Sequence, residues 1–333
     1  MDTMHIGIIG CGGIARCHAK AYAKLDGVEF AAFCDIAEHK AAEFVEQYGG
    51  RAFGSVDAML DAGRLDAVSV ATTPVAHHGP AIAALGRGVH VLCEKPLAAS
   101  VENAADMVRI AEESNALLMT GYPYRFREEI VTTKELLKGG AIGKPLFAHN
   151  TFSCRADRIA ETWFVNRAVS GGGIVLDNGS HSIDLFHHLF GDTRRVHASL
   201  DRLNTTIEVE DTALIMTEHE SGVSGTIELS WSVPRPREWY LEIYGTKGTI
   251  QVKFGEVRYG NTASAEWHTR PGCLDFQDGF DRMIAHFVQC VRTGTTPSPG
   301  GRDGLRAIEV IEQIYREAPA DVTGQARGSA QQT

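Results

Sequence analysis

Residues 171–184 bring together groups that can move a proton. The segment holds three consecutive glycines, then Asp177 and His181, which share one face if a helix begins after the glycines. A carboxylate beside an imidazole is typical of acid–base catalysis, and an imidazole titrates near neutral pH without large tuning. We therefore predict that His181 acts as a general acid and base.

Two interpretations of Asp177 stay open at this point. The carboxylate could orient His181 or a substrate hydroxyl, or it could cap the helix that follows the glycines, a position that suits aspartate. A metal site is a further alternative, because acidic and histidine side chains recur at helical spacing: Asp177, His181, Asp184 and His187. No cysteine or His-x-x-x-His pair accompanies them. We therefore predict no metal.

The N-terminus carries a pattern that is typical of dinucleotide binding. Residues 10–15 fit Gly-x-Gly-x-x-Ala and lie between an apolar run and a helical pattern. The first glycine permits a tight turn, the second lets the backbone approach a pyrophosphate, and the small third residue allows close packing. The amides of the helix then face the phosphates. The predicted phosphate-binding residues are Gly10, Gly12, Gly13, Ile14 and Ala15.

Asp35 favours NAD over NADP. It ends the second apolar run, where a carboxylate would accept hydrogen bonds from a ribose 2′-hydroxyl and repel a 2′-phosphate. Ile36 and Ala37 follow it, so no arginine is adjacent. We therefore predict NAD as the cofactor.

Two further segments follow apolar runs and are expected at the carboxyl edge of the same sheet, where such folds bind ligands. One contains Thr72, Thr73, Pro74 and His77; the other contains Glu94, Lys95 and Pro96. The residues that we predict to contribute to the cofactor site are Thr72, Thr73, Pro74, His77, Glu94 and Lys95. The threonines could equally be helix caps, and we expect His77 and His78 on a helix surface. The Lys95 ammonium could stabilise a developing alkoxide.

Candidate substrate contacts cluster around the glycine segment. Aromatic faces suit a sugar ring, and guanidinium groups suit polar or anionic substituents. The predicted substrate-binding residues are Tyr122, Arg125, Arg155 and Trp163, with Lys95, Asp177 and His181. Core packing for the aromatic residues and surface solvation for the arginines are the alternatives.

The order of predicted elements indicates an α/β protein with two domains. Strands are expected at 5–10, 30–35, 67–71, 90–93 and 117–121, alternating with helices at 14–25, 37–48, 75–85 and 101–114, which is typical of a doubly wound parallel sheet. Six later runs are expected as consecutive strands, and several of them alternate in polarity as antiparallel strands do: 146–153, 196–203, 212–218, 224–230, 240–244 and 249–253. Helices at 276–292 and 302–316 close the chain. We predict a Rossmann domain at 1–122, a substrate and oligomerisation domain at 123–320, and a disordered tail at 321–333.

Composition excludes several classes of function. The chain has 333 residues and a formal net charge of −10, which argues against a nucleic-acid or anionic-membrane surface. No apolar run is long enough to span a membrane, and the N-terminus lacks a signal-peptide pattern. The seven cysteines form no Cys-x-x-Cys pair, which indicates reduced thiols and a cytoplasmic location.

In this order, these motifs resemble the glucose–fructose oxidoreductase, inositol dehydrogenase and rhizopine-catabolism family of NAD(P)-dependent oxidoreductases. The resemblance extends to about residue 314. Glu94-Lys95-Pro96 together with the segment 171–184 carries it most specifically. It implies a Rossmann domain followed by an α/β domain with an open-faced, mostly antiparallel sheet that often forms dimers or tetramers. It also implies catalytic or substrate-binding roles for Lys95 and His181. Residues 121–128 depart from the family pattern, because Pro123 lies inside the segment and Arg127-Glu128 stands where x-Pro is common.

The expected function is an NAD-dependent dehydrogenase acting on a secondary hydroxyl of a sugar, a sugar derivative or an inositol, or a reductase of the corresponding keto sugar. Two alternatives remain. One is a redox-neutral enzyme that retains its NAD and oxidises a sugar transiently for elimination, hydrolysis or epimerisation. The other is an NAD-binding regulatory protein without catalysis. We expect a homodimer or homotetramer through the C-terminal sheet.

Overall fold

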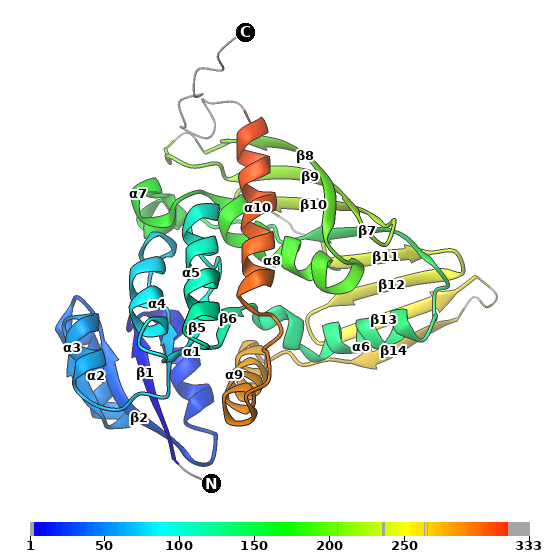
Figure 1. Ribbon diagram of the computed structural model, residues 1–333. Coiled ribbons are helices and arrows are strands. Elements are labelled where there is room, and N and C mark those ends of the chain that lie inside the picture. Colours follow the sequence, from blue (N-terminus) through cyan, green and yellow to red (C-terminus); the bar gives the residue numbers. More distant parts are fainter. Residues whose placement is uncertain (1–2, 205, 235–236, 263, 265, 319–333) are drawn as a thin grey trace. The chain divides into compact units, whose positions relative to one another are not determined.

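The structure is a computed structural model that describes residues 3–204, 206–234, 237–262, 264 and 266–318. These residues divide into two compact units. Unit 1 contains the described residues up to Arg127 and the segment Asp275–Ile308, and unit 2 contains Glu128–Leu274 and the described residues from Glu309 (Figure 1). The division therefore falls within the last helix, α10 (Gly301–Glu317).

Unit 1 is built on a six-stranded parallel sheet in the order β3-β2-β1-β4-β5-β6. Its central strands are rich in fully buried apolar residues, as expected where helices cover both faces. The chain order reverses between β1 and β4, which makes their carboxyl ends the ligand-binding edge in folds of this kind. The strands are β1 (Met4–Ile9), β2 (Val28–Cys34), β3 (Arg51–Phe53), β4 (Ala67–Val70), β5 (His90–Glu94) and β6 (Leu118–Gly121).

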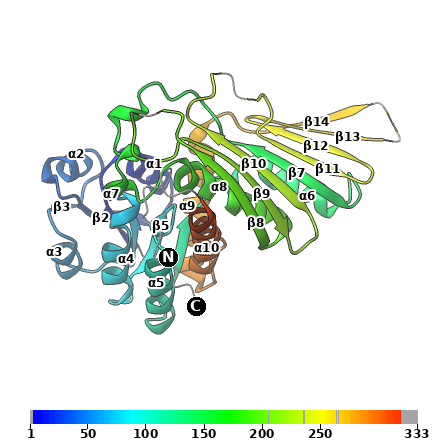
Figure 2. The same ribbon diagram turned by 90° about the horizontal axis from the view of Figure 1, so that it is seen from above.

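Helices lie on both faces of this sheet, with α1 and α2 on one side and α3, α4 and α5 on the other (Figure 2). They are α1 (Gly13–Tyr22), α2 (Glu38–Tyr48), α3 (Val56–Asp61), α4 (His78–Leu85) and α5 (Val101–Glu113). Short 3₁₀ turns occupy Pro74–Ala76 and Pro123–Phe126. Helix α9 (Phe276–Thr293) packs against α1, and its side chains at Phe280, Met283 and Phe287 join the core of unit 1.

Unit 2 is built on an eight-stranded sheet in the order β14-β13-β12-β11-β7-β10-β9-β8. Only β7 and β10 run parallel, and the other neighbours are antiparallel. The strands are β7 (Pro145–Thr151), β8 (Thr193–Asp201), β9 (Thr212–His219), β10 (Ser224–Ser230), β11 (Leu241–Gly245), β12 (Gly248–Lys253), β13 (Glu256–Asn261) and β14 (Trp267–Pro271).

Two helices, α6 (Glu128–Lys138) and α8 (Ile174–Phe190), cover one face of this sheet (Figure 1). Strand β9 shows the consequence, because its residues alternate between buried and exposed positions along the strand. Ala213 and Ile215 are buried, whereas Leu214 and Met216 are more than half exposed on the opposite face. That alternation is typical of an antiparallel sheet with one open face.

The predicted fold class is confirmed: a parallel Rossmann sheet is followed by a mostly antiparallel sheet. The single break expected after residue 122 differs from the division observed, because the segment Asp275–Ile308 belongs with unit 1. The packing of α9 on α1 accounts for the difference. The tail expected at 321–333 lies outside the described residues. No helix within the described ranges combines the length and apolar character that crossing a membrane requires.

Candidate functional site

The turn after β1 has the backbone geometry of a phosphate-binding loop. Gly10 has a φ of +87°, and a Cβ there would lie 2.8 Å from the backbone of Ala71 and Thr72, so only glycine fits. A Cβ on Gly12 or Gly13 would meet nothing within 4 Å, which leaves the loop open for a ligand. Ala15 is fully buried, as the close packing of α1 requires. The amides of the first turn of α1 therefore begin beside an open surface, which suits a pyrophosphate.

Asp35 is held at the end of β2 by two backbone donors. Its Oδ2 accepts a hydrogen bond from the Cys11 amide and its Oδ1 accepts one from the Ala37 amide, both at 2.8 Å. The carboxylate is thus fixed directly beside the glycine-rich turn. Ile36, the next residue, is 97% exposed, an unusual position for an isoleucine in a folded domain. Together they offer a carboxylate for a ribose and an apolar surface for an adenine.

His77 connects two loops of unit 1. It is 1% exposed, with Nδ1 2.8 Å from the Pro96 carbonyl oxygen and Nε2 3.2 Å from the Thr72 carbonyl oxygen. The expectation that His77 lies on a helix surface is therefore wrong, because the side chain turns inward to these carbonyls. His78 does lie nearer the surface, paired with Asp106. Burial lowers the pKa of His77.

The threonines before this histidine are not side-chain caps in the structure. Thr73 occupies the N-cap position of the turn Pro74–Ala76, but its side chain makes no capping hydrogen bond, and Pro74 is buried. The Thr72 hydroxyl donates to the Thr73 carbonyl at 3.5 Å. Both threonines are half-buried at the carboxyl end of β4. They remain candidates for cofactor contact.

Glu94, at the end of β5, belongs to a buried polar chain. Its Oε1 lies 2.8 Å from His18 Nε2, and His18 Nδ1 lies 3.0 Å from the Ser69 hydroxyl, which in turn contacts the Tyr22 hydroxyl at 3.0 Å. Glu94 is 5% exposed and the other three side chains are fully buried. This chain joins α1, which follows the phosphate-binding turn, to the loop that carries Lys95. Lys95 itself is half-buried and precedes Pro96 through a cis peptide bond.

Replacing His18 with alanine is expected to lower the free energy of unfolding by about 3 kcal/mol, because the substitution removes the hydrogen-bond partner of the buried Glu94 Oε1. Urea unfolding at pH 7 would measure the change. The control is His78→Ala, which removes a partly exposed histidine paired with Asp106 and should cost less than about 1 kcal/mol. Equal losses in the two variants would contradict this account.

In unit 2, Asp177 and His181 lie on α8 as the spacing predicts. Both are half-buried, whereas the residues between and beyond them are mostly buried. The His181 ring meets Phe152 edge-on, with centroids 6.4 Å apart, and Asn178 donates to the Phe152 carbonyl at 2.9 Å. Gly173 is the N-cap, and the Asp177 amide bonds the Gly173 carbonyl inside the helix. Asp177 is therefore not the cap of α8.

The proposed substrate contacts fall into two groups. Trp163 is 40% exposed and stacks on Phe164 at 4.0 Å, and Arg155 pairs with Asp157 on the surface of the same segment. Tyr122 and Arg125 of unit 1 are buried instead. Arg125 lies 3.3 Å from Asp303. Burial alone would raise the pKa of Asp303, but the Arg125 guanidinium leads the charges and hydrogen bonds that hold this pKa below its usual value.

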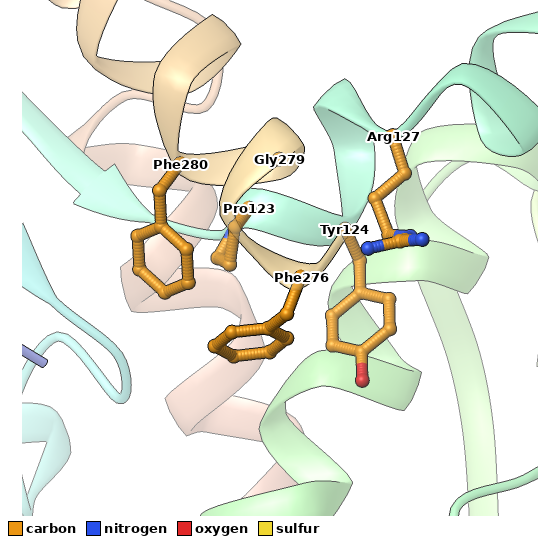
Figure 3. Close-up of a pocket in the computed structure, with 6 residues that line it drawn as sticks. All are labelled: Pro123, Tyr124, Arg127, Phe276, Gly279 and Phe280. Atoms are coloured by element: carbon orange, nitrogen blue, oxygen red, sulfur yellow. The ribbon is translucent and has the colours of Figure 1, made fainter. Parts of the chain in front are cut away.

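A small hollow in unit 1 lies beside these residues. It is lined by Pro123, Tyr124, Arg127, Phe276, Gly279 and Phe280. Figure 3 shows the rings in a row, with the Arg127 guanidinium next to Tyr124. Its cavity volume of about 10 Å³ is close to the space that one water occupies and far below the roughly 300 Å³ at which ligand pockets begin. We therefore assign no ligand to this hollow.

Neither a cluster of metal-ligating side chains nor a disulfide occurs in the part of the chain that the structure describes. There, no three histidine, cysteine, aspartate or glutamate side chains come together as a metal site requires. All seven cysteines lie in this part of the chain and are free thiols. Burial raises the pKa of Cys11, the thiol in the glycine-rich turn, to about 12.

Comparison with known proteins identifies the family. Residues 4–122 match the family described as an oxidoreductase family with an NAD-binding Rossmann fold, and residues 130–251 match the GFO/IDH/MocA C-terminal domain. D-apiose dehydrogenase from Paraburkholderia graminis is 31% identical over 327 residues, covering 93% of this chain and 86% of that protein. The chain belongs to the GFO/IDH/MocA family. This GFO/IDH/MocA protein is an NAD(P)-dependent oxidoreductase acting on CH–OH groups, which confirms the predicted enzyme class and NAD as its cofactor.

Two solved structures resemble this GFO/IDH/MocA chain over nearly its whole length. An oxidoreductase from Agrobacterium radiobacter in complex with NAD⁺, L-tartaric acid and magnesium has a TM-score of 0.86 at 25% identity, and the match covers 97% of each chain. An aldose–aldose oxidoreductase from Caulobacter crescentus has a TM-score of 0.84 at 27% identity, covering 94% of this chain and 97% of that one.

Several residues of interest carried no motif in the sequence. His18 and Ile36 are visible only once the exposure of each side chain is known, because a helical histidine and an isoleucine after a strand are ordinary in a sequence. Glu210 and Tyr315, whose contacts with the start of α8 are described below, are 105 positions apart and come together only through the fold. The one local signal in the sequence was Ile36 itself, an apolar residue directly after the acidic Asp35.

Proposed function

We propose that this protein is an NAD-dependent dehydrogenase that oxidises a secondary hydroxyl of a sugar, a sugar derivative or an inositol, or reduces the corresponding keto sugar. The observation that carries this proposal is the half-buried pair Asp177 and His181 on an otherwise largely buried helix, in a chain with an NAD-binding domain. The apiose dehydrogenase and the aldose–aldose oxidoreductase support a sugar as substrate.

In the proposed reaction bound NAD would supply the hydride acceptor, its nicotinamide C4, for the C–H bond of the carbinol that breaks. The hydroxyl proton passes to the imidazole of His181, so that a ketone or lactone and NADH are formed. Lys95 donates a hydrogen bond to the reacting oxygen and stabilises its negative charge as the proton leaves. Asp177 orients the substrate hydroxyl or the imidazole. Reduction uses the same groups in reverse.

For substrate binding, the exposed residues of unit 2 are the stronger candidates. Trp163 offers a flat apolar face to a ring, and Arg155 offers hydrogen-bond donors from the same segment. We propose that Tyr122 and Arg125 contribute from buried positions, by supporting the loop that contains the turn Pro123–Phe126.

The test is the appearance of NADH when purified protein is incubated with NAD and a panel of aldoses, uronates, inositols and glycosides. Turnover of one panel member with a measurable kcat would support the proposal and begin to define the ring geometry. Bound NAD with no turnover of any sugar, and no oxidation of NADH by keto sugars, would contradict it in favour of a regulatory role.

A redox-neutral reaction with retained NAD is a second candidate, and the similarity to an aldose–aldose oxidoreductase favours it. An enzyme that oxidises one sugar and reduces another must keep its cofactor between the two half-reactions. Gel filtration distinguishes the two candidates: NAD that co-elutes with the protein supports retention, whereas protein that elutes without nucleotide supports a dissociable cofactor.

Replacing Asp35 with alanine is expected to weaken NAD binding by roughly 10- to 100-fold, the loss expected for a hydrogen bond to a charged acceptor. Discrimination against NADP should relax at the same time, because the carboxylate no longer repels a 2′-phosphate. Fluorescence titration with both cofactors would measure the two dissociation constants. The control is Asp66→Ala, which removes a carboxylate that bonds the His5 amide at the start of β1, on the opposite edge of the sheet. An unchanged preference in Asp35→Ala would remove Asp35 from the site.

We also propose a homodimer or homotetramer formed through the open face of the sheet in unit 2. The support is the exposure of large apolar side chains there: Phe147, Leu214 and Met216. Light scattering would test the proposal, since a monomer at micromolar concentration would contradict it.

The free cysteines support a cytoplasmic location.

A further inference from the structure

Each of the three glycines before α8 is required for a different steric reason. Gly171 has a φ of +84° and ends the short helix α7 (Arg167–Ser170) in the left-handed region. A Cβ on Gly172 would lie 2.4 Å from the Tyr315 hydroxyl, and one on Gly173 would lie 2.0 Å from the Glu210 carbonyl oxygen. The glycines therefore let the start of α8 approach two particular residues closely.

One of these two residues, Glu210, acts as the cap of α8. No local side chain caps α8. Instead, the Glu210 carbonyl accepts from the Ile174 amide at 3.0 Å, and its Oε1 accepts from the amides of Gly173 and Val175 at 3.0 and 3.2 Å. Residue 210 thus satisfies three consecutive amides that a helix otherwise leaves without partners. It lies just before β9, so this contact joins the helix to its sheet.

Tyr315, on α10, completes the contact. Its hydroxyl donates to the same Glu210 Oε1 at 2.5 Å, and both side chains are buried. Glu210 Oε2 is also buried, and it finds no hydrogen-bond partner within the described ranges. Burial raises the pKa of Glu210, and burial with the neighbouring Glu210 raises that of Tyr315. A buried carboxyl oxygen without a hydrogen-bond partner is costly.

We propose that Glu210, with Tyr315, is a positioning residue that fixes the first turn of α8 and thereby the orientation of Asp177 and His181. The inference rests on the proposed role of His181 in the reaction. The physical link is short, since Asp177 lies one turn after Gly173 and His181 one turn further. A small rotation of the first turn would move both side chains together, and misplacing a catalytic group by about 1 Å can cost about 10²-fold in rate.

The test compares Glu210→Ala, Glu210→Gln and Tyr315→Phe with the wild-type protein. Glutamine keeps an oxygen for the amides and has nearly the same shape, so it should restore most of what alanine loses. Glu210→Ala should lower kcat by about 10²-fold without changing the Kd for NAD, because NAD binds to the Rossmann unit. Tyr315→Phe, which removes one donor, should lie between wild type and Glu210→Ala.

A second measurement reports on the stability of the first turns of α8 and needs no substrate. Amide hydrogen exchange, followed by mass spectrometry, should rise in peptides covering 173–181 in Glu210→Ala and stay protected in Glu210→Gln. The matched control is Asp211→Ala. This neighbouring carboxylate is equally buried but accepts from the Leu203 and Asn204 amides and the Ser232 hydroxyl, away from α8. Its removal should leave exchange at 173–181 unchanged.

Three results would overturn the proposal: unchanged exchange and kcat in Glu210→Ala, equal losses in the glutamine and alanine variants, or a rise in exchange across unit 2 that matches Asp211→Ala. If the wild-type protein oxidises no sugar, the proposed function fails, and the exchange experiment still decides whether Glu210 fixes the helix.

Discussion

Replacing His181 with alanine is expected to lower kcat by about 10²- to 10⁴-fold, the range that a positioned general acid or base contributes. The Kd for NAD should not change, because the phosphate-binding turn and Asp35 lie in the Rossmann unit. Steady-state rates with the best substrate and fluorescence titration with NAD would measure the two quantities. The limb of the wild-type pH–rate profile that reports the catalytic base should disappear in the variant.

His187→Ala is the matched control for this experiment. His187 lies on the same helix, and its Nε2 contacts the Thr193 hydroxyl at 2.9 Å. It has no proposed role in the reaction, so its loss should leave kcat near the wild-type value. A fall in NAD affinity in His181→Ala, or an equal loss of kcat in the two variants, would assign His181 a structural role.

The second large effect is expected at Lys95. Methionine keeps the length and apolar stem of the side chain but removes the ammonium, so Lys95→Met should lower kcat by about 10²- to 10³-fold, as removal of one donor to a developing oxyanion does. The loss should appear in kcat and kcat/KM together, because the negative charge develops in the transition state.

Steady-state kinetics with saturating NAD would separate the two parameters. Lys20→Met, at an exposed position of α1, removes the same charge elsewhere in the Rossmann unit and should change neither parameter. A rise in KM with an unchanged kcat would show that Lys95 binds the substrate equally in the ground and transition states, and the proposed charge stabilisation would be wrong.

The sequence predicted the Rossmann sheet well because buried parallel strands leave a strong local signal. Each apolar run expected before residue 122 is a strand, and only the three-residue β3 was missed. In the second sheet, β13 and β14, the last two strands at one end of the strand order, were missed. All five residues of β14 are exposed, and only Val257 of β13 is buried, so neither strand carries the alternation that marks a half-buried strand. Their pairing comes from backbone hydrogen bonds, which a sequence does not display.

The candidate site also contains features that the sequence predicted and features that it did not. The glycine-rich turn, Asp35 and the helix carrying Asp177 and His181 were predictable because each depends on residues a few positions apart. The burial of His77 was not predictable, because it depends on a carbonyl nineteen residues away. The same holds for the cap of α8. A local cap was one interpretation of Asp177, but the cap comes from Glu210, which is 35 and 37 positions from the amides that its carboxylate binds.

His77 has one further consequence for the two loops that it joins. A neutral imidazole carries one N–H, and burial keeps this side chain neutral at pH 7 by lowering its pKa. It therefore cannot donate to both carbonyls at once. The distance of 2.8 Å to Pro96, against 3.2 Å to Thr72, favours the tautomer with the proton on Nδ1, which nitrogen-15 chemical shifts would report. In that tautomer a ring lone pair faces the Thr72 carbonyl. The loop bearing Lys95 is then tethered by a hydrogen bond, while the Thr72 loop is not.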